Sequence, residues 1–167
     1  MGHPTYNLMR ISDGREGIRQ TLKLMSTISR KYSTAPQIRE LACKIVAKVP
    51  EKQWGQEAAA ILAFCQKAIR YTKDIEGVET LQTPAQTLRI GQGDCDDKSM
   101  LAASLLMSVG HPARFRAVGM IKGTLSHVFV ETKMGGKWVA LETTENWPLG
   151  RVAKGIRDNM IEHIPRA

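Results

Sequence analysis

The sequence is poor in aromatic residues and in cysteine. Phe, Trp and Tyr make up 5% of its 167 residues, and its cysteines are Cys43, Cys65 and Cys95. An odd number of cysteines argues against a disulfide scaffold, and none forms a CxxC pair or a metal-ligand spacing with the four histidines. We therefore expect no metal, no cofactor and a protein of a reducing, cytoplasmic compartment.

Long apolar runs and long runs of one charge are also missing. The most apolar stretch, AAAILAF at 58–64, is too short to span a bilayer, and MGHPTYNLMR at the start has no signal-peptide core. We therefore expect no membrane partner. Lys and Arg outnumber Asp and Glu by 24 to 16, but no five like charges occur together, so solvated helix faces explain the excess better than nucleic-acid binding.

The first two thirds of the chain follow a helical pattern. With 167 residues, 43% of them hydrophobic, the chain suits one compact core, and we expect a single domain spanning 1–167. Apolar residues recur at helical spacing, which predicts helices over 15–33, 36–49, 53–71 and 95–109. The stretch 74–93 collects Gly, Pro and Thr and predicts a loop with one helical turn at 84–89.

Beyond residue 112 the apolar period changes to two. Strands are predicted over 113–121, 126–133 and 138–144, the last two joined by a hairpin at 134–137. The tail from 147 onward fits either an edge strand at 160–164 or a partner-docking segment. The pattern predicts an α+β fold, with a helical part over about 15–110 packed on an antiparallel sheet over about 112–165.

Cys95 begins the last predicted helix, in the stretch GDCDDKSMLAASLL at 93–106. Backbone N–H groups at a helix N-terminus favour thiolate and can hold a developing oxyanion. Asp94, Asp96 and Asp97 would raise the pKa of the thiol if they faced it. We interpret them as helix-start residues, the latter two aimed mostly away from the sulfur, and expect an imidazolium partner to be needed.

His127 is the best-placed histidine, because in SHVFVETK it lies on a strand face with Phe129 and Glu131. Glu142 on the adjoining strand could orient its ring. A hairpin turn on 134–135 puts Glu142 directly across from His127, whereas a turn on 135–136, better suited to a type I′ turn, puts it diagonally, opposite Phe129. Either register leaves both on one face. A surface Glu–His pair is the competing interpretation, weakened because Trp138 and Ala140 share that face.

Three motifs occur in the order found in one family. GDCDDKSMLAASLLMSVGHPARFRAVG, then HVFVE, then KWVALETT resemble the core of the transglutaminase-like superfamily over roughly residues 60–145. The upstream AIRYTKDIEGVETLQTPAQTL is similar to versions in bacteriophage and prophage genomes. The resemblance implies a transglutaminase-like, papain-like fold, with Cys95 as nucleophile, His127 as general base and Glu142 in the orienting position, which is usually Asp.

The same resemblance suggests residues around this triad. The oxyanion candidates are the Cys95 backbone N–H, Gln92 and Gln86, although an exposed loop amide is the simpler interpretation of both glutamines. Gly93, which permits a close backbone approach, Asp94 and Trp138 are expected as structural residues near the site.

The family forms an acyl-enzyme on cysteine, and the acceptor decides the outcome. The small size favours hydrolysis of an amide or peptide bond in a peptide or protein substrate; crosslinking of a glutamine to an amine is the alternative. A third hypothesis is a phage structural or assembly protein, virion-associated and partnered by phage structural proteins, that keeps the fold with little or no catalysis.

Overall fold

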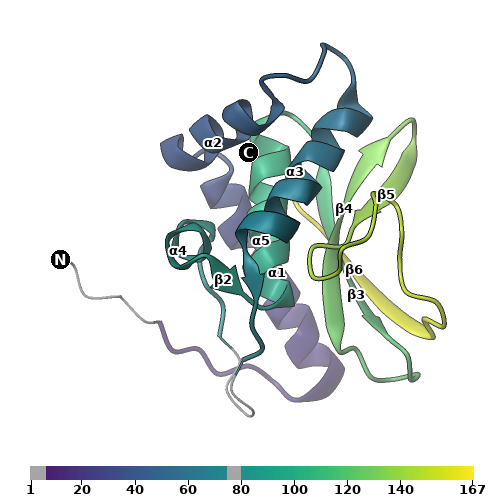
Figure 1. Ribbon diagram of the computed structural model, residues 1–167. Helices are drawn as coiled ribbons and strands as arrows, with labels where there is room; N and C mark the ends of the chain where they lie inside the picture. The colour runs from purple at the N-terminus through teal and green to yellow at the C-terminus, as the bar shows by residue number, and fades with distance from the viewer. Residues whose placement is uncertain (1–6, 75–79) are drawn as a thin grey trace.

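The computed structural model describes residues 7–74 and 80–167, so part of the predicted 74–93 loop lies outside the described residues. The helices and strands follow the predicted order of helices first, sheet second (Figure 1). The helices are α1 (Gly14–Tyr32), α2 (Pro36–Val46), α3 (Trp54–Ala68), α4 (Pro84–Ile90) and α5 (Cys95–Ser108). The strands are β1 (Arg70–Tyr71), β2 (Gln92–Gly93), β3 (Ala113–Gly119), β4 (His127–Met134), β5 (Lys137–Leu141) and β6 (Asp158–His163).

Helix α5 lies at the centre of the molecule, between the other helices and the sheet (Figure 1). Its residues 97–106 are all buried, although the sequence predicts only one apolar stripe. The polar members of this stretch are small or bonded: Ser99 donates to the Val128 carbonyl and Ser104 to the carbonyl of Met100. A helix buried on every side holds its N-terminal residue, Cys95, in a fixed place.

The main sheet has the strand order β5-β4-β3-β6, with every neighbouring pair antiparallel. The β4–β5 hairpin turns on Gly135 and Gly136, whose φ angles of 55° and 81° suit a type I′ turn. Val130 therefore pairs with Leu141, which is the second of the two registers considered. In this register Glu142 lies diagonal to His127 and follows the last paired residue of β5.

The tail forms the predicted edge strand. Strand β6 pairs with β3, so that Ala117 lies opposite Met160. Between β5 and β6 the chain crosses the outer face of the sheet, where Val152 and Ile156 pack against Phe129 and its neighbours. The α+β fold with helices on one face of an antiparallel sheet agrees with the sequence prediction.

Two predicted helices end earlier than expected. Helix α2 stops at Val46, and α3 stops at Ala68 because Ile69 is extended, with φ −115° and ψ 111°. The next residues, Arg70 and Tyr71, form β1 and pair in parallel with β2, which ends two residues before Cys95. That partner lies 22 residues further along the chain (92 − 70), so local periodicity does not reveal it.

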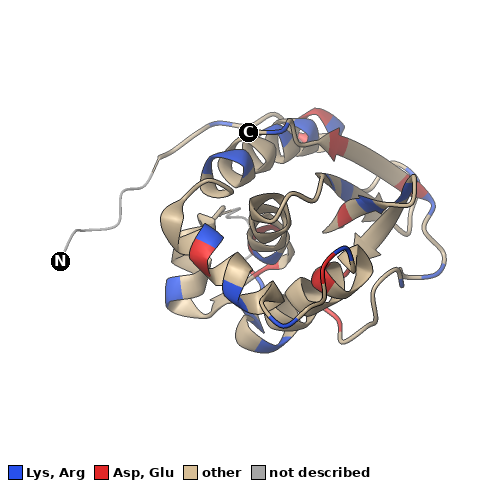
Figure 2. Cartoon of the chain, turned by 90° about the horizontal axis from the view of Figure 1, so that it is seen from above, with Lys and Arg blue, Asp and Glu red and all other residues tan. Residues whose placement is uncertain are grey.

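Charged residues are spread around the molecule. Figure 2 shows Lys and Arg on several helices and strands, with Asp and Glu among them. Within the described ranges, 7–74 and 80–167, no helix is both long and apolar enough to cross a membrane.

Candidate active site

Cys95 is the first residue of α5, and a capping box fixes this helix start. The Asp94 carboxylate accepts from the Asp97 backbone N–H at 3.0 Å, and the Asp97 carboxylate accepts from that of Asp94 at 3.3 Å. Asp97 also accepts from the backbone N–H of Gln82 at 2.7 Å and from its side chain at 2.8 Å. A Cβ on Gly93 would lie 2.6 Å from the Asp97 Cβ, so only glycine fits before the cap.

Asp96 faces the thiol, which corrects the expectation that it points away. The Cys95 Sγ lies 3.4 Å from the Asp96 Oδ1 and donates to it. Burial, together with the charges of Asp96 and Asp94, raises the pKa of Cys95 well above its ordinary value, although a hydrogen bond from the Val128 backbone N–H opposes this. Burial and the two carboxylates therefore favour the neutral thiol over the thiolate.

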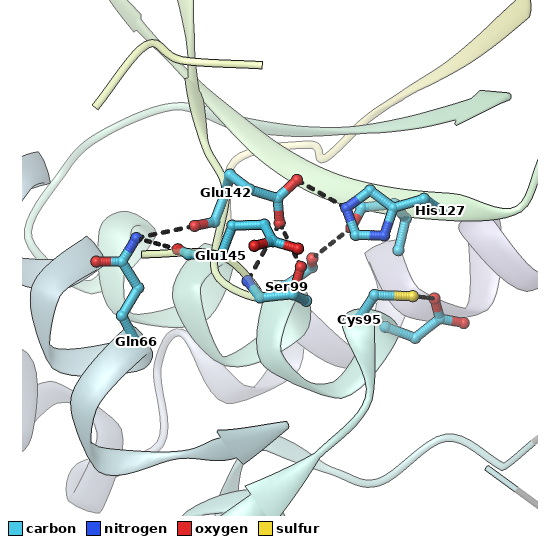
Figure 3. A network of polar contacts seen from close by, with 9 residues as sticks. Gln66, Cys95, Ser99, His127, Glu142 and Glu145 are labelled. Carbon is cyan, nitrogen blue, oxygen red and sulfur yellow. Dashed lines mark hydrogen bonds and ion pairs between the residues drawn. The ribbon is translucent and has the colours of Figure 1, made fainter. Parts of the chain in front are cut away.

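The backbone of Val128 connects the thiol to the histidine strand. Its N–H bonds the Cys95 sulfur, and its carbonyl accepts from Ser99, one turn further along α5, at 3.3 Å. His127 immediately precedes Val128 at the start of β4. In Figure 3 the His127 ring presents one nitrogen to Glu142 and turns the other toward the side where the Cys95 sulfur lies.

Glu142 lies behind the histidine, on the side of the ring away from Cys95 (Figure 3). Its Oε2 is 2.7 Å from the His127 Nε2, and its Oε1 accepts from the Thr144 backbone N–H at 3.1 Å and hydroxyl at 2.9 Å. The Glu142 side chain is 4% exposed and that of His127 31%, so the pair is open to solvent only on the histidine side.

The pair perturbs both pKa values. Burial opposes charge on His127, but the hydrogen bond and charge of Glu142, with Asp96 and Glu145 nearby, outweigh it and raise the pKa of His127 above its ordinary value. Burial would raise the pKa of Glu142, but the bonds from His127 and Thr144 bring it below its ordinary value. Glu142 therefore stays ionised, and the imidazole is a stronger base than a free one.

The two glutamines expected as oxyanion donors each turn the side-chain oxygen toward an arginine. The Gln92 side-chain oxygen accepts from Arg70 at 2.7 Å, and that of Gln86 accepts from Arg89 at 3.0 Å and 2.9 Å. Among the hydrogen bonds of the described residues, none links either glutamine to Cys95 or His127. The Cys95 backbone N–H lies in the first turn of α5, where such groups face an incoming oxyanion.

Tyr71 lies beside the site, although its position in a predicted helix gave no signal for it. Pairing of Tyr71 with Gly93 brings its phenol near the thiol. Burial, with the charges of Asp94 and Asp96, raises the pKa of Tyr71, so the phenol remains a hydrogen-bond donor. At 43% exposed it can also reach a substrate.

Lys98 is a second residue that sequence patterns did not reveal. It is 2% exposed, lies within the apolar α5, and donates from its Nζ to the carbonyl of Ile69. Burial lowers the pKa of Lys98, while the nearby Cys65 and Glu142 favour its charged form. The positive charge of Lys98 and the negative charge of Glu142 attract each other. A charged residue inside an apolar helix is the sequence signal that could have identified it.

Trp138 does not lie near this site. It pairs with Lys133, at the other end of β4 from His127, so six residues of strand, about 20 Å, separate them. There the Arg114 guanidinium lies 4.3 Å from its ring centroid and His163 meets its edge. Trp138 shares a sheet face with His127, as expected, but strand length places it at the far end.

Comparisons with known proteins agree with this arrangement. The sequence profile of the Transglutaminase-like superfamily matches residues 39–143, which include Cys95, His127 and Glu142. This chain belongs to the transglutaminase-like superfamily. A search of curated proteins found no matching sequence.

Solved structures show the same transglutaminase-like fold. A candidate cysteine protease from Cytophaga hutchinsonii superimposes with a TM-score of 0.57 and 19% identity over 85% of this chain and 51% of that one. A candidate protease from Parabacteroides distasonis superimposes with a TM-score of 0.59 and 14% identity. The match covers 77% of this chain and 27% of that one. Calcium-bound LapG from Legionella pneumophila superimposes with a TM-score of 0.56 and 16% identity. The match covers 81% of this chain and 80% of that one. The chain thus spans about half and about a quarter of the first two proteins.

Across residues 7–74 and 80–167, no group of three or more His, Cys, Asp or Glu side chains is arranged to hold a metal ion. Asp94 and Asp97 instead bond each other's backbone N–H groups, as the first turn of α5 requires.

Proposed function

We propose that this chain is a cysteine hydrolase that cleaves an amide or peptide bond through a thioester on Cys95. The observation that carries the proposal is the 2.7 Å bond between His127 and Glu142, formed next to Val128, whose carbonyl accepts from Ser99 on the helix that begins at Cys95. A nucleophile, a base and a group that orients the base are the parts that acyl transfer requires.

The reaction can be derived from these positions. As the Cys95 sulfur forms a bond to the substrate carbonyl carbon, its proton passes to His127. The backbone N–H of Cys95 and the Tyr71 hydroxyl would face the oxyanion. His127 then returns the proton to the leaving nitrogen, the C–N bond breaks, and an amine departs. Water attacks the thioester, losing a proton to His127, and the acid leaves as Cys95 regains its proton.

The three sequence hypotheses differ in the fate of the thioester, or in whether it forms. Crosslinking uses the same thioester with a lysine amine in place of water, and Asp96 and Glu145 would attract such a cation. In the third hypothesis the chain keeps the fold with little or no catalysis, so the thioester does not form. A phage origin and phage structural partners stay predictions of the sequence.

A peptide library analysed by mass spectrometry, with and without an added amine, tests the proposal. We expect cleavage by the wild type that Cys95→Ala abolishes. Amine incorporation in place of cleavage would support the crosslinker, and silence of both proteins across the library would support the non-catalytic fold. The Cys43→Ala variant is the control, because Cys43 is an exposed cysteine of α2.

A further inference from the structure

The turn that carries Glu142 has no strand partner among the described residues. Strand β5 ends at Leu141, and residues 142–147 leave the sheet. The oriented carboxylate of the site therefore belongs to a turn and not to the ladder. A group that sets the angle of His127 must itself be held within a fraction of an ångström, and a turn alone does not do this.

Gln66, on the last turn of α3, meets that turn from the helix side. Its side-chain Nε2 lies within hydrogen-bond distance of the backbone carbonyls of Glu142 at 3.0 Å, Glu145 at 2.7 Å and Trp147 at 2.9 Å, so its two N–H groups serve three acceptors. Three carbonyl oxygens around one amide fix its orientation, because only the nitrogen end can face them. Figure 3 shows Gln66 reaching the backbone of Glu142 and Glu145 from the side opposite His127.

We propose that Gln66 is a positioning residue of this site, whose amide fixes the 142–147 turn and thereby aims Glu142 at His127. The inference rests on the proposed function, in which Glu142 orients the base. Gln66 contacts no reacting atom; it acts through the backbone of Glu142. The same bonds place Glu145, whose charge also acts on His127.

The surroundings of Gln66 determine which variant tests its role. A hollow of about 320 Å³ lies beside it, bordered also by Lys67 and residues 143–146. In Gln66→Ala, water could enter from this hollow and replace the amide. Gln66→Leu keeps the volume and helix propensity and leaves no donor, so it is the sharper change.

The test is the titration of His127, measured by NMR of the imidazole in the full chain. With Glu142 loosened in Gln66→Leu, the titration midpoint of His127 should fall toward the ordinary value of 6.5. Gln56→Leu, an exposed position on the same helix, should leave it unchanged. An unchanged midpoint in folded Gln66→Leu would overturn the proposal.

A second variant and a kinetic readout complete the design. Gln66→Asn keeps the amide on a side chain one methylene shorter; it should lower the midpoint less than Gln66→Leu, and it serves as the test if the leucine variant does not fold. On a cleaved peptide we expect kcat to fall about tenfold or more with KM little changed. A rise in KM alone would count against a positioning role. The NMR arm needs no substrate, so it distinguishes failure of this inference from failure of the proposed hydrolase.

Discussion

At the scale of single residues, the length of the Glu142 side chain suits its position in the hairpin. Glu142 lies diagonal to His127, and diagonal neighbours have Cβ atoms about 7–8 Å apart. A side chain one methylene longer than Asp spans this separation, and the 2.7 Å bond shows that it does.

Shortening this side chain should disturb the site without removing its charge. We expect Glu142→Asp to lower kcat/KM about 10- to 100-fold, because the carboxylate no longer reaches His127 in its bonded position. The measurement is hydrolysis of a peptide found in the library. Glu145→Asp is the matched control on the same turn, and equal losses in the two variants would contradict the assignment of Glu142.

A second prediction for a single residue concerns Asp96, whose charge raises the pKa of the Cys95 thiol. Asp96→Asn removes the neighbouring charge, so we expect iodoacetamide to label Cys95 about three- to tenfold faster at pH 7. Peptide mapping by mass spectrometry quantifies the label on each cysteine, and exposed Cys43 serves as the internal reference. Slower labelling of Cys95 would show that Asp96 assists the thiol instead of restraining it.

At the scale of elements, the sequence predicts what local spacing determines. The start of α5 at Cys95 is set by the Asp94 cap, and the His127 strand by its alternation with Val128 and Val130. The residues that local patterns do not reveal depend on distant partners. Tyr71 leaves the predicted helix to pair with Gly93, and Gln66 reaches a turn that begins 76 residues later.

The close approach at the start of α5 makes a prediction about stability. A methyl group on Gly93 would collide with the Asp97 side chain, so we expect Gly93→Ala to lower the free energy of unfolding by about 1–3 kcal/mol. Gly55→Ala is the control: it lies in α3, its Cβ would meet nothing nearer than a Met134 sulfur at 4.0 Å, and it should gain about 0.5–1 kcal/mol. Denaturant unfolding measures the free energy of unfolding of both variants. An unchanged value for Gly93→Ala would show that the Asp97 side chain can move aside without loss of stability.

At the scale of the whole molecule, the His127–Glu142 pair links stability to pH. The lowered pKa of Glu142 gives stability that is present above about 4.5 and lost as pH falls through the folded value. The raised pKa of His127 gives stability that is present below 6.5 and lost as pH rises through its folded value. The ion pair therefore stabilises the protein most between these two values.

Glu142→Gln should reveal this window. Glutamine can still bond a neutral imidazole but cannot pair with a charged one, so its stability deficit should be greatest between pH 4.5 and 6.5 and smaller at pH 9. Thermal unfolding of wild type and variant across this range measures the deficit. A deficit that is constant with pH would mean that the pair is a neutral hydrogen bond.

Activation of Cys95 by His127 is the property on which the proposed chemistry depends. The most direct measurement is the rate at which iodoacetamide modifies Cys95 between pH 6 and 9 in wild type and in His127→Ala, with Cys43 as reference. We predict that the variant reacts about tenfold or more slowly at Cys95, while Cys43 is unaffected. Equal rates at Cys95 in the two proteins would contradict this activation.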